Sequence, residues 1–143
     1  MATGSVLGIL LAARGGSGSG GSEPTSSPPI SLPSGELGIV TPDGASAAVL
    51  GLCEVRTTLG SSVTEANAIF DDRVHEELHI IAAATQTQDV DAAATLLEAK
   101  ERVEADFAHD AAAPAMRADV DALLGATRAA LSAIGLDTPA CPA

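Results

Sequence analysis

Apolar residues recur every three or four positions in four separate segments that follow Asp43. This spacing places apolar side chains on one face of a helix. It predicts helices at about 45–59, 62–85, 90–108 and 114–134. The apolar positions that define the four faces are Val49, Leu52, Val55 and Leu59; Phe70, Val74, Leu78 and Ile81; Leu96, Val103 and Phe107; and Val120, Leu123, Leu131 and Ile134.

The ends of these segments carry helix start and stop signals. Ser62 and Glu65 match a capping box, in which a hydroxyl caps the helix and a carboxylate follows three residues later. Pro114 suits a first helical position, and Gly135 suits the left-handed residue that follows a helix. No segment alternates like a strand, and the links are short. We therefore expect an all-α chain, with an antiparallel up-down-up-down four-helix bundle after a disordered N-terminal tether.

The chain divides by composition into three parts. Residues 1–14 resemble a signal peptide, because the apolar run 6–13 is too short to span a membrane but fits a signal's apolar region. Residues 15–44 are rich in Gly, Ser and Pro, which predicts a disordered tether. Residues 45–143 hold the predicted bundle.

Leu11, Ala12 and Ala13, followed by the Gly/Ser-rich tether, resemble the signal of bacterial exported lipoproteins. In that family the next residue is a cysteine that receives a lipid, whereas this chain has Arg14 there. The first five residues also lack the side-chain positive charge that usually begins a signal. The resemblance implies export to the cell envelope, with membrane association only through the N-terminus. A disordered cytosolic leader is the alternative.

Composition narrows the range of partners. The 143 residues carry a net charge of −12 with seven Lys or Arg, and Phe70 and Phe107 are the only aromatic residues. Binding to nucleic acid needs clustered cations and aromatic stacking, so no nucleic-acid partner is expected. The acidity also excludes a polybasic contact with anionic lipid.

The only two cysteines, Cys53 and Cys141, lie far apart in the sequence and form no C-x-x-C motif. In the predicted bundle, the start of the first helix and the end of the fourth lie at the same end. The segment 136–141 is long enough to fold back to Cys53. A disulfide is therefore expected, which would persist in an oxidising compartment. Two unrelated buried thiols are the alternative.

One chemical motif stands out, since His75, Glu76 and His79 match the H-E-x-x-H pattern of zinc metalloproteases. Histidines at i and i+4 share a helical face and can bind one zinc, while the glutamate activates a bound water. Glu76 is thus the one weak catalytic candidate for a minimal zinc hydrolase. A third ligand would be sought among Glu98, Glu101 and Glu104.

The helical wheel places the motif away from the predicted core. At 100° per residue, Asp72, His75, Glu76 and His79 group on the face opposite the large apolar residues. There they form a patch of nitrogen and oxygen ligands suited to Zn²⁺, Cu²⁺ or Ni²⁺. A solvated polar face without metal is the alternative.

Arg73 and Glu77 fall inside the apolar half of the same wheel, as i,i+4 partners. A partly buried ion pair is one interpretation, and a groove edge or partner contact is another. A rotation of the helix that carries this pair to solvent would move His75 toward the core.

The leading hypothesis is a small exported, envelope-associated helical bundle that acts as a non-enzymatic binding or accessory protein. Its partner would be a protein or small ligand of the cell envelope. The first alternative is an extracytoplasmic protein that binds a divalent transition metal at the helical patch. The second is the minimal zinc hydrolase.

Overall fold

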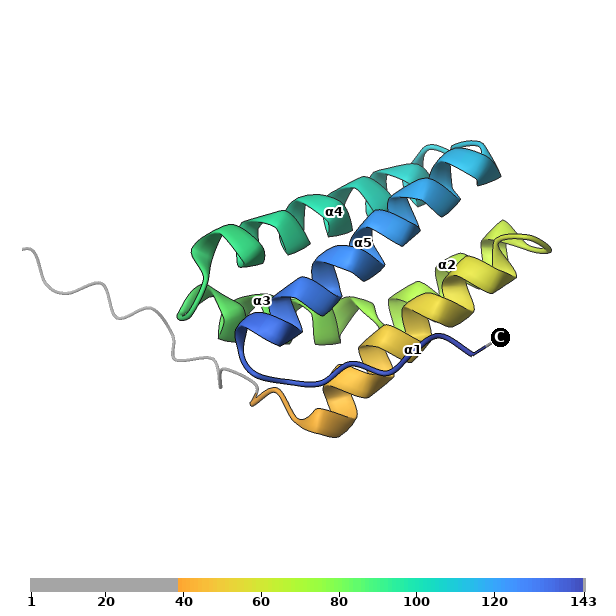
Figure 1. Ribbon diagram of the computed structural model, residues 1–143. Coiled ribbons are helices and arrows are strands. Elements are labelled where there is room, and N and C mark those ends of the chain that lie inside the picture. Colours follow the sequence, from red (N-terminus) through yellow and green to blue (C-terminus); the bar gives the residue numbers. More distant parts are fainter. Residues whose placement is uncertain (1–38, 143) are drawn as a thin grey trace, which may run out of the picture. The chain divides into compact units, whose positions relative to one another are not determined.

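The computed structural model describes residues 39–142, which form five α-helices and no strand (Figure 1). The expected all-α class is confirmed. The predicted signal-like segment and most of the predicted tether lie outside the described residues. The helices are α1 (Pro42–Thr58), α2 (Val63–Arg73), α3 (His75–Gln86), α4 (Val90–Ala108) and α5 (Ala113–Ala133).

The helix starts follow local signals. Helix α1 begins at Pro42, three residues before the predicted start, because the Thr41 hydroxyl accepts the Gly44 N–H at 3.0 Å. The predicted cap at Ser62 is confirmed, since its Oγ accepts the Glu65 N–H at 3.2 Å. Asp89 caps α4 in the same way, accepting the Ala92 N–H at 2.9 Å. Each cap satisfies one N–H that the helix itself leaves without a partner.

The single helix predicted over 62–85 is wrong, because the structure divides it into α2 and α3 at Val74. Val74 leaves helical geometry with φ −122° and ψ −45°, although its N–H still bonds to Phe70. Its side chain packs directly onto Gly51 of α1, so closely that a Cβ at Gly51 would lie 2.6 Å from Val74 Cγ2. The sequence offers no Gly or Pro at this break. A contact between helices, rather than a local signal, accompanies it.

The core lies where all five helices meet. Helix α4 packs along α3 and α5, while α1 packs along α2 and α5 (Figure 1). Burying one large aliphatic or aromatic side chain stabilises a fold by about 1.5–3 kcal/mol. The largest fully buried side chains are Val49, Leu52, Val55, Phe70, Val74, Leu78, Ile81, Leu96, Val103, Met116, Leu123 and Leu131.

The residues after α5, 135–142, form a tail that runs back along α1 (Figure 1). The turn into the tail uses Gly135 at φ +76°, the left-handed geometry that the sequence predicts there. The tail ends in a disulfide between Cys53 and Cys141, whose Cα atoms lie 5.5 Å apart. The predicted pairing is therefore confirmed, and it fastens the end of the chain to α1.

None of the five described helices combines the length and the hydropathy that crossing a membrane requires.

Candidate functional site

The break at Val74 divides the predicted metal patch between two helices. Asp72 ends up on α2, whereas His75, Glu76 and His79 occupy the first turns of α3, and only His75 is partly buried. The prediction that His75 faces away from the core is wrong. Its Nε2 lies 2.9 Å from Glu104 Oε1 on α4, and its ring packs against Phe70 with 6.2 Å between centroids. The buried positions Phe70, Val74, Leu78 and Ile81 keep one helical spacing through the break, and His75 lies at the edge of this buried face, beside α4.

Arg73 and Glu77 do not form a buried i,i+4 pair, because each contacts a different part of α1. Arg73 is exposed and forms an ion pair with Glu54 of α1. The Glu77 carboxylate lies beside the first turn of α1, where a Cβ at Gly44 would be 2.8 Å from its Oε2. A negative charge is favourable there because it faces the positive end of the helix dipole.

The polar α4 cluster lies between α3 and α4 and consists of His75, His79, Lys100 and Glu104. Lys100 is only 4% exposed, and its Nζ donates to Glu104 Oε1 at 2.7 Å. The same carboxylate oxygen therefore receives both Lys100 and His75. Burying an ammonium group without a partner costs free energy, and the Glu104 carboxylate offsets this cost for Lys100.

The histidine rings of this cluster lie side by side, with 4.9 Å between their centroids. Desolvation lowers the pKa of His79, and the charges of Lys100 and His75 lower it further, while Glu104 acts in the opposite direction. A lowered pKa favours the neutral imidazole, the form that binds metals. Within residues 39–142, however, no group of three or more His, Cys, Asp or Glu side chains is arranged to hold a metal ion.

A second polar feature joins α4 to α5 through the carboxyl groups of Asp106 and Asp119. Asp106 Oδ2 is buried and has no hydrogen-bond partner among the described residues. Burial raises the pKa of Asp106, and the hydrogen bond and the negative charge of Asp119 raise it further. Asp119 also faces Arg102 Nε at 3.5 Å. Burial beside a second carboxyl group favours the protonated form of Asp106.

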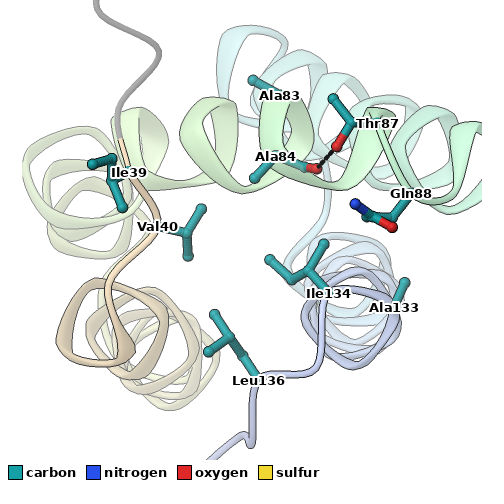
Figure 2. Close-up of a pocket in the computed structure, with 9 residues that line it drawn as sticks. All are labelled: Ile39, Val40, Ala83, Ala84, Thr87, Gln88, Ala133, Ile134 and Leu136. Carbon is teal, nitrogen blue, oxygen red and sulfur yellow. Dashed lines mark hydrogen bonds between the residues drawn. The ribbon is translucent and has the colours of Figure 1, made fainter.

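The apolar end pocket is a cavity of about 670 Å³ near the C-terminal ends of α3 and α5 (Figure 2). Val40, Ile134 and Leu136 point into the central space, while Ala83 and Ala84 line it from α3. Ile39 is 87% exposed at its edge. The nine lining residues are Ile39, Val40, Ala83, Ala84, Thr87, Gln88, Ala133, Ile134 and Leu136.

None of these nine side chains titrates, so the pocket offers shape and aliphatic surface rather than charge. Sequence reasoning missed it, because its walls come from the residue run before α1, the end of α3 and the turn after α5. Ile134 was predicted only as a core residue of the last helix. The one available signal was the adjacent apolar pair Ile39 and Val40, shortly before the predicted start of the first helix.

The sequence also gave no indication that Lys100 would be buried, since its i,i+4 partner Glu104 suggested an exposed pair. It did place Glu104 among the possible partners of the histidines, together with Glu98 and Glu101. The structure brings Glu104 to His75 and leaves the other two exposed.

No protein-family model matches the chain, no curated protein matches it, and no solved structure matches it. The interpretation of the site therefore depends on its own residues.

Proposed function

We propose that the chain is a small exported, envelope-associated binding protein without enzymatic activity, whose ligand occupies the apolar end pocket. In this proposal the helices form an antiparallel up-down-up-down four-helix bundle, with α2 and α3 together serving as its second member. The short connections between successive helices support that topology. The disulfide supports an oxidising, extracytoplasmic location, because cytosolic thiols are kept reduced.

The apolar end pocket is the observation that carries the binding function. Its volume of about 670 Å³ lies within the range of pockets that hold small molecules. Aliphatic side chains dominate its walls, and Thr87 and Gln88 supply the few polar groups that orient a ligand. Because no wall residue is charged, the favoured ligand is a small, neutral, largely apolar molecule.

A neutral apolar fluorophore, N-phenyl-1-naphthylamine, tests this pocket directly. We expect saturable binding to the purified protein, reported by an increase in fluorescence. Ala84→Phe places a ring in the pocket and should weaken binding by at least tenfold. Ala105→Phe, at an exposed position of α4, is the matched control and should leave binding unchanged. Equal binding by both variants, with helical content preserved, would refute the pocket as the site.

Export is tested separately, by the intact mass of the protein recovered from its native host. Removal of the signal-like segment lowers the mass, a lipid raises it, and the disulfide lowers it by two protons. Recovery of the full, unprocessed chain with two free thiols would contradict the proposed location.

Metal binding at the predicted patch remains the second hypothesis, supported by the edge-to-face contact of the His75 and His79 rings. The Lys100 ammonium beside Glu104 counts against it, because it occupies the carboxylate that would complete the site. Calorimetric titration with Zn²⁺ and Cu²⁺ is the test, with His79→Ala as the variant expected to lose binding. In the hydrolase alternative, Glu76→Gln retains the metal and abolishes hydrolysis.

A further inference from the structure

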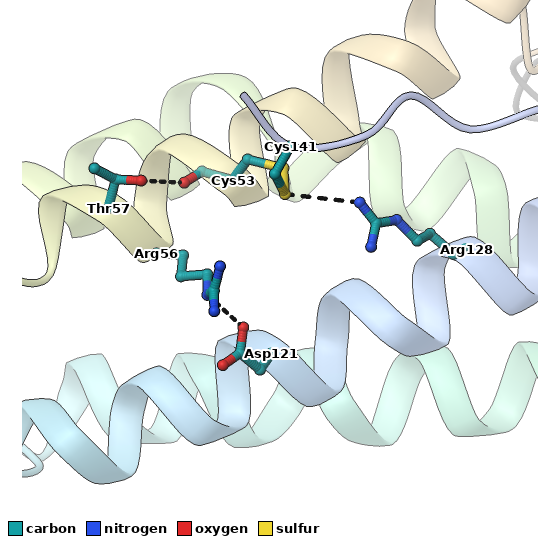
Figure 3. Close-up of polar contacts among 6 residues, drawn as sticks. All are labelled: Cys53, Arg56, Thr57, Asp121, Arg128 and Cys141. Carbon is teal, nitrogen blue, oxygen red and sulfur yellow. Dashed lines mark hydrogen bonds and ion pairs between the residues drawn. A yellow bond between two sulfur atoms is a disulfide. The ribbon is translucent and has the colours of Figure 1, made fainter. Parts of the chain in front are cut away.

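A second pocket, on another side of the molecule, gathers positive charge in an acidic protein. We call it the arginine pocket, a cavity of about 520 Å³ between α1, α5 and the tail (Figure 3). Arg56 of α1 and Arg128 of α5 line it, together with Asp121. The whole chain has only seven Lys or Arg against 19 Asp or Glu, and two of the seven meet here.

Each guanidinium group contacts the protein along one edge. Its other edge carries N–H groups that can donate to a ligand. Arg56 Nε lies 2.6 Å from Asp121 Oδ1. Arg128 Nη2 donates to the Pro139 carbonyl at 3.3 Å and lies 3.6 Å from Cys141 Sγ. A guanidinium carries five N–H donors in a planar fork. The bonds made by the described residues thus use one nitrogen of each arginine.

The charges of the arginine pocket select the class of ligand. Two arginines and one aspartate leave a net charge of +1, which one monoanion neutralises. A carboxylate fits a guanidinium fork through two parallel hydrogen bonds. The apolar part of the wall, formed by Leu124, Pro139 and Ala140, suits a short aliphatic chain rather than a second charge.

We propose that the arginine pocket binds the carboxylate of a small aliphatic acid, with the unused edges of Arg56 and Arg128 as its donors. The site is separate from the apolar end pocket and does not depend on it. One wall is the tail, which the Cys53–Cys141 disulfide holds against α1 (Figure 3). Binding therefore requires the disulfide, since a released tail removes Pro139 and Ala140 from the pocket wall, together with the carbonyl that positions Arg128.

Titration of the intact protein with sodium butyrate, followed by NMR shifts of backbone amides, tests the proposal. We expect saturable shifts in the tail and α5 that n-butanol, a neutral analogue, does not produce. Arg128→Met should weaken butyrate binding by at least tenfold. Arg102→Met, which removes a paired arginine from α4, is the matched control and should have no effect. Unchanged binding by Arg128→Met, or equal shifts with n-butanol, would overturn the proposal.

Three further binding measurements test the chemical class of the ligand and the role of the tail. Inorganic phosphate should bind more weakly than butyrate, because its second charge has no partner. N-acetyl-alanyl-alanine carries a peptide's terminal carboxylate, and tighter binding than butyrate would identify that source of the group. The Cys53→Ser/Cys141→Ser variant should lose butyrate binding while the helices remain. Retained binding would refute the dependence on the disulfide. If the double variant fails to fold, Arg128→Met still decides whether the arginine pocket binds butyrate.

Discussion

The two sides of the core are held by different kinds of interaction. On the α1 side, a disulfide fastens the tail and Val74 packs directly onto the backbone of Gly51. On the α4 side, Lys100 is buried against Glu104, and two carboxyl groups face each other between α4 and α5. The stability of the α1 side should therefore depend on the oxidation state of the cysteines and on side-chain volume. The stability of the α4 side should depend on the charges of its side chains and on pH.

Removing the disulfide tests the α1 side most severely. The bond joins residues that are 88 positions apart, and such a crosslink stabilises by about 4–5 kcal/mol in the chain-entropy treatment. We expect the Cys53→Ser/Cys141→Ser variant to lose about that much unfolding free energy in urea titration. Reduced wild-type protein should match the variant. A loss below about 1 kcal/mol would show that the tail contributes little constraint to the unfolded chain.

Removing the partner of the buried lysine is the corresponding test of the α4 side. Glu104→Gln leaves the Lys100 ammonium buried without its carboxylate and should cost about 1.5–3 kcal/mol in unfolding free energy. The double variant Lys100→Met/Glu104→Gln should recover most of that loss, because an apolar side chain needs no partner. Equal losses in the single and double variants would mean that packing, not charge, holds this side.

Two glycine substitutions distinguish tight packing from open surface. Gly51→Ala puts a Cβ 2.6 Å from Val74 Cγ2 and should destabilise the fold by about 1–3 kcal/mol. Gly125→Ala, in α5, meets no atom within 4 Å and should stabilise it by about 0.5–1 kcal/mol through helix propensity. Thermal unfolding of both variants measures the difference. Stabilisation by Gly51→Ala would show that Val74 does not need this close approach.

The carboxyl pair makes the α4 side sensitive to pH. Because the pKa of Asp106 is raised in the folded state, the native protein holds a proton that the unfolded chain releases. Its stabilising contribution is thus complete below the unfolded pKa and is lost as pH rises through the folded pKa. Asp106→Asn should flatten this decline and gain stability relative to wild type as pH rises. Urea titrations from pH 3 to pH 8 measure it, with Glu101→Gln, an exposed change on α4, as the control.

Much of the fold was predictable from local patterns. The apolar spacing identified the helical regions, and the signals at Ser62 and Gly135 gave the right cap and the right left-handed residue. The pairing of Cys53 with Cys141 followed from an expected topology combined with a count of two. The candidate site was less predictable. The helical wheel placed His75 on a solvated face, because a wheel for one helix cannot show that α4 packs against that side of α3.

The sequence by itself determined the helical class, the cap at Ser62, the left-handed turn at Gly135 and the disulfide partners, because these depend on residue spacing and residue type. Only the tertiary structure decided where α2 ends, which charges are buried and where the pockets lie. The break at Val74 accompanies a contact with Gly51 that is remote in sequence, and Lys100 is buried beside Glu104, where α4 packs against its neighbouring helices. Both pockets combine walls from distant segments. Periodicity describes one helix at a time, whereas such features depend on the relative placement of several.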